Sequence, residues 1–239
     1  MPPNKITILS TRSIDQLLIS EAAAKNIIVD VVPFIKTEPT SSIETQQEIE
    51  HVSTMTATVV FTSRNAVEAV VTELDGYQPD WQIFCISHAT REAVEKFFHK
   101  NSIAGTAANA KDLADDIVKQ TDTNEVIFFC GDQRRNELIE ILRAADIEVN
   151  EVIVYQTAAV PQKIDKKYDG ILFFSPSAVK SFFQKNKPVE QTVLFAIGDT
   201  TAKELRNYSN NKIMVSSQPD KNDLIKVMIR YFQENPIHH

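Results

Sequence analysis

Short apolar runs rich in β-branched residues alternate with longer amphipathic stretches along the whole chain. The runs that predict strands are 6–10 (ITILS), 58–63 (TVVFTS), 82–87 (QIFCIS), 125–130 (EVIFFC), 170–175 (GILFFS) and 192–197 (TVLFAI). Each is followed by a segment with apolar residues at helical spacing, such as Leu138, Ile141 and Leu142. The runs are apolar throughout, which is typical of parallel strands buried on both faces by helices. Repeated strand–helix units of this kind predict an α/β protein.

The order of the segments predicts two copies of one plan. Three pairs of segments match in the same order: 59–71 with 171–183, 83–98 with 194–207, and 5–39 with 125–161. In the first pair, VVFTSRNAVEAVV stands opposite ILFFSPSAVKSFF, and the first two pairs have nearly the same offset. A duplicated α/β unit is the simplest explanation.

Two stretches bounded by proline are predicted to be extended and belong to neither copy. They are Pro33 to Pro39 and Tyr155 to Pro161. Proline lacks a backbone donor and pushes the preceding residue towards extended geometry, so these stretches are natural crossing points between domains. Two partitions remain open: tandem halves (1–122 and 123–239), or a discontinuous arrangement in which the chain crosses twice.

Composition narrows the classes of function. The net charge of −7 argues against a nucleic-acid partner, because phosphate binding needs a basic surface. The five glycines are too far apart for GxGxxG or GxxxxGK, which excludes the usual dinucleotide and phosphate loops. Two cysteines in apolar runs cannot form a disulfide scaffold and suit a reducing cytoplasm. No run approaches the ~20 apolar residues of a membrane-spanning helix, and no signal-peptide pattern precedes the first strand, so we expect a cytoplasmic protein without a membrane partner.

Hydroxyl residues end the predicted strands just where a helix begins. They are Thr62-Ser63 before Asn65, Ser87-His88-Ala89-Thr90, Ser175-Pro176-Ser177 and Gly198-Asp199-Thr200-Thr201. Plain helix capping explains any single site, because serine and threonine accept hydrogen bonds from the free N–H groups of the first turn. Four such sites at the carboxyl ends of parallel strands, where α/β sheets bind ligands, favour a ligand with several carboxylates or phosphates.

Charged side chains near the strand ends add to this picture. Arg12 and Arg135 can supply positive charge to an anionic ligand, whereas Arg64 and Arg134 are interpreted as solvated surface residues. His88 stands at a strand end, where a ligand-facing role and a plain loop role are equally consistent. The histidines show no metal-ligand spacing, so no metal site is expected.

The cysteines and Tyr155 are the other residues that could take part in chemistry. Cys85 and Cys130 are interpreted as small core residues and not as reactive thiols. Tyr155 stands at the mouth of a crossing segment, where its phenol can donate a proton to a leaving group. Packing of Tyr155 against the linker is an equally good interpretation.

Several patches resemble the uroporphyrinogen III synthase family, over nearly the whole chain. FTSRNAV (61–67) is similar to the family's FTSxNAV, and FSPSAV (174–179) to its second version. The remaining similar patches are IGDTTAKEL (197–205) to IGxTTAxxL, CGDQRRNEL (130–138) to a glycine-to-arginine helix start, and VYQT (154–157) to VYxT. Their order and spacing together make the resemblance specific. Ser87, Arg91 and Cys130 depart from the pattern, standing where glycine, alanine and arginine are usual.

The resemblance implies a particular architecture. Similar proteins have two parallel-sheet α/β domains, built as flavodoxin-like units from an internal duplication and joined by a two-stranded linker. Carried onto this chain, the first domain would hold 1–35 and 161–239, the second 38–157, with linkers at 36–37 and 158–160. The active site would be the cleft between the domains, and the thin linkers predict hinge motion.

The resemblance also implies a reaction. Enzymes of this family are lyases of tetrapyrrole (haem, sirohaem and cobalamin) biosynthesis that cyclise hydroxymethylbilane with inversion of ring D, giving uroporphyrinogen III and water. No metal or organic cofactor is expected, because no redox or hydrolytic step occurs. We expect a monomer, with a transient hand-off of substrate from hydroxymethylbilane synthase.

The expected site lies at the strand ends. The residues assigned to substrate binding are Arg12, Thr62, Ser63, Asn65, Ser87, His88, Thr90, Gly131, Arg135, Ser175, Ser177, Gly198, Thr200 and Thr201. Tyr155 is assigned to departure of the substrate hydroxyl.

Two alternatives remain. One is a two-lobed protein that binds a tetrapyrrole or another polyanion without catalysis. The other is a two-domain sugar-phosphate or nucleotide enzyme, against which the lack of a glycine-rich phosphate loop counts.

Overall fold

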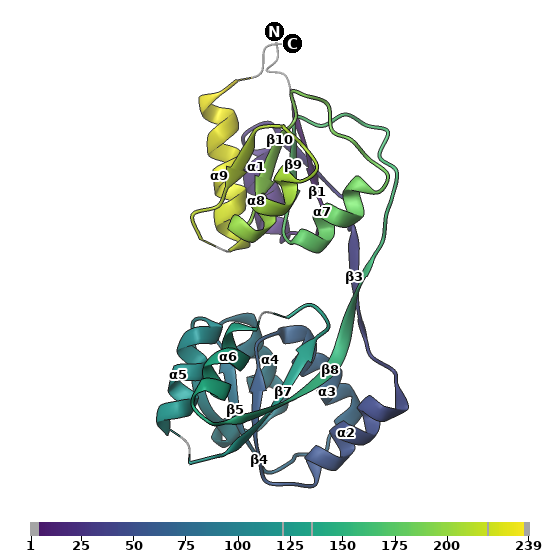
Figure 1. The fold of residues 1–239 in the computed structure, drawn as a ribbon. Helices are drawn as coiled ribbons and strands as arrows, with labels where there is room; N and C mark the ends of the chain where they lie inside the picture. The colour runs from purple at the N-terminus through teal and green to yellow at the C-terminus, as the bar shows by residue number, and fades with distance from the viewer. Residues whose placement is uncertain (1–4, 121, 135, 219, 237–239) are drawn as a thin grey trace. The chain divides into compact units, whose positions relative to one another are not determined.

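Two compact units make up the chain. The structure, a computed structural model, describes residues 5–120, 122–134, 136–218 and 220–236. Unit 1 comprises Met1–Lys36 and Ala158–His239, and unit 2 comprises Thr37–Thr157. Each unit is a sheet flanked by helices (Figure 1). Among the helices of these described ranges, none has the length and apolar character that crossing a membrane requires.

Unit 1 contains a five-stranded sheet in the order β11–β10–β9–β1–β2, with every neighbouring pair parallel. Helices α1 and α9 pack on one face, and α7 and α8 pack on the other. The elements are β1 (Ile6–Ser10), α1 (Gln16–Ala23), β2 (Ile27–Val31), β9 (Gly170–Phe173), α7 (Pro176–Phe183), β10 (Val193–Ala196), α8 (Asp199–Arg206), β11 (Ile213–Val215) and α9 (Lys221–Glu234).

Unit 2 is built around a six-stranded sheet in the order β3–β8–β7–β4–β5–β6. Helices α2, α3 and α4 cover one face, and α5 and α6 cover the other. The elements are β3 (Ile35–Pro39), α2 (Ile43–Ser53), β4 (Ala57–Phe61), α3 (Arg64–Leu74), β5 (Trp81–Ile86), α4 (Ala89–Phe97), the short 3₁₀ helix η1 (Lys100–Ser102), β6 (Ile103–Ala107), α5 (Ala110–Gln120), β7 (Glu125–Gly131), α6 (Glu137–Ala144) and β8 (Glu148–Ala159).

The continuous apolar character of the predicted strands has the expected cause. In β4, Val59 and Phe61 belong to the core under α3, whereas Val60 belongs to the core under α5 and α6. All three side chains are fully buried. Successive side chains of a strand point to opposite faces, so a strand covered on both faces needs apolar residues at every position. The α/β class predicted from the sequence is therefore confirmed.

All six predicted strands are present, and their ends differ from the prediction in an informative way. The runs 58–63 and 170–175 were predicted to be strand up to their hydroxyl residues, but β4 ends at Phe61 and β9 ends at Phe173. The hydroxyl residues therefore lie in the connections to the next helix. The predicted extended stretches, 33–39 and 155–161, contain β3 and the end of β8.

The two sheets have the same strand order when they are matched by the sequence repeat. The repeat sets β7 and β8 against β1 and β2, and β4 and β5 against β9 and β10. With this matching, β8–β7–β4–β5–β6 corresponds to β2–β1–β9–β10–β11. Numbered in chain order within unit 1, the order is 2-1-3-4-5, which is flavodoxin-like. The shared order supports the duplicated unit that the sequence predicts.

Strands β3 and β8 contain the two points at which the chain passes from one unit to the other. They are neighbours in the sheet of unit 2. The Thr40 N–H donates to the Val154 carbonyl at 2.9 Å, and the Val160 N–H donates to the Phe34 carbonyl, also at 2.9 Å. Residue numbers rise along one strand as they fall along the other, so the two strands run antiparallel (Figure 1).

Candidate functional site

The expected site residues gather at the carboxyl edge of each sheet. In unit 2, Thr62, Ser63 and Asn65 follow β4, and Ser87 and His88 follow β5. These strands and β7 are parallel neighbours, so the residues that follow them lie at one edge of the sheet.

Unit 1 repeats this arrangement at its own sheet edge. Arg12 follows β1, Ser175 and Ser177 stand at the start of α7, and Gly198 and Thr200 stand at the start of α8. Strand β9 pairs with both β1 and β10 in parallel register, so the three connections are neighbours.

Two of the four helix starts are capped by a serine side chain. Ser63 Oγ accepts a hydrogen bond from the Asn65 N–H at 3.2 Å, and Ser175 Oγ accepts one from the Ala178 N–H at 3.2 Å. Capping, the plainer of the two interpretations of these serines, is therefore confirmed at both positions. A cap satisfies one donor of the first turn, so other N–H groups of the same turn stay available to a ligand.

The other two helix starts have no side-chain cap. At the start of α4, His88 lies at φ 65°, which is unusual for a residue with a side chain, and its side chain makes no capping hydrogen bond. At the start of α8, Gly198 is extended and has no side chain to cap with. Uncapped first-turn N–H groups carry the positive end of the helix dipole, so these starts suit an anion better than the capped ones.

The threonines assigned to substrate binding differ in how exposed they are. Thr200 and Thr62 are exposed and half-buried, respectively. By contrast, Thr90 is 4% exposed and Thr201 is 1% exposed, so both side chains lie inside their units. Their assigned role as carboxylate ligands stays a prediction.

Ser87 is engaged within unit 2. Its N–H and its hydroxyl both donate to the Ala107 carbonyl, at 2.7 and 2.8 Å. These two bonds tie the end of β5 to the end of β6, so the Ser87 hydroxyl has a structural partner in this structure.

Asn65 and Tyr155 line one hollow of about 150 Å³ in unit 2. Tyr155 comes from β8, and Asn65 is the second residue of α3. The other lining residues are Thr37, Glu38, Pro39, Glu68, Ala69 and Thr72. Two of the expected site residues therefore line the same hollow: Asn65 at the start of α3, and Tyr155, the residue assigned to catalysis.

The acidic and hydroxyl residues of this hollow were not among the expected site residues. Along α3, Asn65, Glu68, Ala69 and Thr72 line it at intervals of three and four residues. Side chains at this spacing share one face of a helix. Extending the face from Asn65 would have found Glu68 and Thr72, whereas the sequence carried no signal for Glu38 on β3.

Gly131 lies directly beneath the Tyr155 ring. The two residues are neighbours across β7 and β8, at a shift in register that follows Cys130. A Cβ atom built on Gly131 would stand 2.7 Å from Tyr155 Oη, closer than real Cβ contacts. The glycine therefore makes room for the phenol at the carboxyl end of β7.

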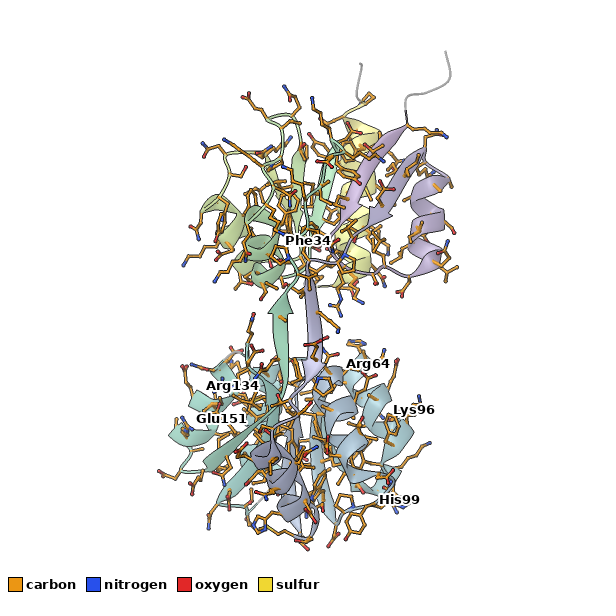
Figure 2. All side chains as sticks on the ribbon, turned by 90° about the vertical axis from the view of Figure 1, so that its right-hand side faces the viewer. Phe34, Arg64, Lys96, His99, Arg134 and Glu151 are labelled. Atoms are coloured by element: carbon orange, nitrogen blue, oxygen red, sulfur yellow. The ribbon has the colours of Figure 1, made fainter. Side chains whose placement is uncertain are left out.

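The arginines of unit 2 differ from one another (Figure 2). Arg64 pairs with Glu68 at 2.7 Å and stays 62% exposed, as predicted for a solvated residue. Arg134 was also predicted to be solvated, and this is wrong: its side chain is 27% exposed and forms an ion pair with Glu151, which Arg143 joins at 3.3 Å. Glu151 on β8 is the register neighbour of Phe128 in β7, so Arg134 reaches it from the segment that follows β7.

Of the two arginines assigned to substrate binding, Arg12 lies within the described residues and Arg135 does not. Arg12 is exposed after β1, with its carbonyl accepting from Ser10 Oγ at 2.6 Å. Arg135 lies outside the described residues, so its assignment stays a prediction.

The two cysteine thiols and His99 are not part of the candidate site. Cys85 and Cys130 are buried, as predicted, and burial raises the pKa of each thiol to about 11. His99 lies towards the end of unit 2 opposite to Arg64 (Figure 2). Within the described part of the chain, no three histidine, cysteine or acidic side chains cluster as metal ligands would.

These features define a class of protein: an α/β protein of two similar units, each with helix starts suited to anions at the carboxyl edge of its sheet. The sequence profile of the family described as uroporphyrinogen-III synthase HemD matches residues 17–226, more than half of the chain. The chain therefore belongs to the uroporphyrinogen-III synthase family, cyclising lyases of tetrapyrrole biosynthesis, which confirms the resemblance of its motifs.

Two solved structures share the fold. A mutant uroporphyrinogen III synthase from the extremely thermophilic bacterium Thermus thermophilus matches with a TM-score of 0.61 at 11% identity, over 96% of this chain and 100% of that chain. The uroporphyrinogen-III synthetase of Helicobacter pylori matches with a TM-score of 0.63 at 14% identity, over 95% of this chain and 99% of that chain. A search of curated proteins finds no match.

Proposed function

We propose that this chain converts hydroxymethylbilane into uroporphyrinogen III and water, with inversion of ring D. The match to the family over residues 17–226 carries this proposal. The substrate is a linear tetrapyrrole with eight carboxylates, and the first-turn amides of α3, α4, α7 and α8 are suited to such groups.

We propose that the substrate is held between the two units. Its carboxylates would bind the helix starts of unit 2 on one side and those of unit 1 on the other. Charge-assisted hydrogen bonds contribute about 1.5–3 kcal/mol each, so a flexible ligand needs several of them to be fixed in one geometry. Exposure favours Thr200 as a contact over the buried residues Thr90 and Thr201.

To make this product, the enzyme has to bind the substrate in the one folded geometry that leads to inversion of ring D. Loss of the terminal hydroxyl gives an electrophilic azafulvene, and the substituted position of ring D attacks it to form a spiro intermediate. This intermediate opens and the ring closes again with ring D inverted. Free in solution the same substrate closes without inversion, so the catalyst must hold the inverted path, which is catalysis by positioning.

Tyr155 is the group we assign to departure of the hydroxyl. Its phenol donates a proton to the leaving oxygen, the C–O bond breaks, and water leaves; the proton lost when the ring closes restores the phenol. Support comes from its place in one hollow with Asn65 and from its hydroxyl, which has no hydrogen-bond partner within the described residues.

The product distribution tests this proposal. The protein is supplied with hydroxymethylbilane from a coupled synthase, and the type I and type III products are separated after oxidation. We expect an excess of type III that grows with the amount of protein. Type I alone, together with binding of the tetrapyrrole, would instead support a binding protein without catalysis.

We further propose that the enzyme works as a monomer that takes hydroxymethylbilane from its synthase by a transient hand-off. Light scattering during size-exclusion chromatography should give the mass of one chain, 26.9 kDa. A stable dimer would contradict the first part of this proposal.

A further inference from the structure

The backbone around Tyr155 is fixed to Asp132, the residue that follows β7, just beyond the register shift. The Asp132 N–H donates to the Tyr155 carbonyl at 3.1 Å, and the Thr157 N–H donates to Asp132 Oδ1 at 2.9 Å. Gly131 itself is the register neighbour of Tyr155. Because these bonds hold the two strands together, an added methyl group at position 131 is relieved by moving the Tyr155 ring and not by moving β8.

The direction in which the Tyr155 ring points depends on the space above Gly131. The ring packs against the core under α3 and lines the hollow that contains Asn65. A Cβ atom on Gly131 would meet the hydroxyl end of the ring, at 2.4 Å from Cζ, 2.5 Å from Cε2 and 2.7 Å from Oη. A side chain at position 131 would therefore displace this end of the ring, and the phenol oxygen with it.

We propose that Gly131 is the positioning residue for the Tyr155 phenol, acting through Tyr155 and not by touching substrate. This inference rests on the proposed role of Tyr155 and replaces the assignment of Gly131 as a substrate contact. Displacement of a reacting group by about 1 Å can lower the rate about 100-fold, so a single methyl group is a sufficient perturbation.

Unit 2 contains a second glycine in the same geometry, and this provides a matched control. Gly105 on β6 is the register neighbour of Phe84 on β5, again at a register shift. A Cβ atom there would stand 2.6 Å from Phe84 Cε1. Phe84 is 1% exposed, so its ring serves the core alone. G105A therefore introduces a clash with an aromatic ring in the core, and neither Gly105 nor Phe84 lines the candidate site.

The first experiment compares the turnover of wild type, G131A, Y155F, G131A/Y155F and G105A with hydroxymethylbilane. We expect G131A to lower kcat by about 10- to 100-fold with a small change in KM. Since both changes act on one hydroxyl, the double variant should match Y155F within about twofold. G105A should keep the wild-type kcat at temperatures where it is folded.

The second experiment follows the Tyr155 ring without using activity. The chain has five tyrosines, so the protein labelled with 3-fluorotyrosine should give few enough fluorine resonances for Y155F to identify that of Tyr155. We expect the Tyr155 resonance to shift in G131A and to stay in place in G105A. If G131A does not fold, the cause should be the ring, and G131A/Y155A should then fold and regain stability in urea.

The outcomes separate this inference from the proposed function. If Y155F is slow while folded G131A turns over like wild type, Gly131 does not position the phenol, and the role of Tyr155 stands. Additive losses in the double variant, or an unshifted Tyr155 resonance in G131A, also overturn the positioning role. If Y155F keeps full turnover, the role of Tyr155 fails, whatever the fluorine spectra show.

Discussion

At the scale of single residues, neighbours decide which predicted groups are open to a ligand. Ser63 caps α3, and the Ser87 hydroxyl bonds to the Ala107 carbonyl, so both hydroxyls are already engaged. The Tyr155 phenol lies in the hollow beside Asn65. The sequence could place all of these residues at strand ends, but it could not say which hydroxyl has an internal partner, since that depends on the register of neighbouring strands.

Replacing Tyr155 with phenylalanine removes only the phenol oxygen. We expect Y155F to lower kcat about 100-fold or more with little change in KM, because loss of a general acid costs about 10² to 10⁴ in rate. Steady-state kinetics with separated type I and type III products measures this. Y77F is the matched control, since Tyr77 is 56% exposed in the segment after α3 and should turn over like wild type. Unchanged turnover in Y155F would remove the phenol from the mechanism.

At the scale of elements, burial of both faces of a strand decides how well the sequence predicts it. The six strands with long apolar runs were all predicted, because both of their faces are buried. The strands β2 (IIVDV), β6 (IAGTA) and β11 (IMV) were missed. All three are edge strands of their sheets and only partly buried, so nothing in their composition requires a continuous apolar run.

The two serine caps should behave alike, because α3 and α7 occupy matching positions in the repeat. We expect S63A and S175A each to lower the free energy of unfolding by about 1 kcal/mol, and S63G and S175G by less, since glycine is tolerated at this position. Urea unfolding measures the four values. Equal stability of S63A and wild type would mean that the Ser63 bond to the Asn65 N–H adds nothing.

The loop before α9 gives a pH-dependent contribution to stability. Asp223 Oδ2 accepts from Ser216 Oγ at 2.6 Å, from Ser217 Oγ at 2.9 Å and from the Gln218 N–H at 3.0 Å. These bonds, the one from Ser216 first, lower the pKa of Asp223 to about 2. The unfolded carboxyl titrates near 3.8, so the contribution is complete above that pH and is lost as pH falls towards 2.

Replacing Asp223 with asparagine should therefore lower Tm at neutral pH, and the difference from wild type should shrink as pH falls from 5 towards 2. Thermal unfolding followed by circular dichroism across this range measures the difference. D122N is the control for replacing an exposed aspartate that takes no part in these hydrogen bonds. A gap of constant size from pH 5 to pH 2.5 would contradict the assignment of these hydrogen bonds.

At the scale of the whole molecule, each unit has its own core. The apolar clusters of unit 1 contain no residue of unit 2, and the reverse also holds, among the residues that the structure describes. The repeat predicted the duplicated plan and the proline-bounded segments predicted crossing points. Residue patterns alone left tandem and discontinuous partitions open, because pairing between distant strands leaves no local mark.

Separate cores predict separate unfolding, and the single tryptophan makes this measurable. Trp81 is 3% exposed in unit 2, where its Nε1–H donates to the Val52 carbonyl at 3.0 Å. We expect S63A to shift the urea transition seen by tryptophan fluorescence, whereas S175A should leave that transition in place and shift only the circular dichroism curve. A fluorescence transition that moves equally in both variants would show that the units unfold as one.

The position of β1 between β2 and β9 affects how the nascent chain folds on the ribosome. Both β1 and its neighbour β2 have been synthesised once the chain reaches Val31. The other neighbour of β1, β9, starts only at Gly170. At roughly 5–20 residues per second, an unpaired edge of β1 waits on the order of ten seconds, while all of unit 2 is synthesised and can fold. The first thirty or so residues are therefore the segment of this protein on which chaperones should act during translation.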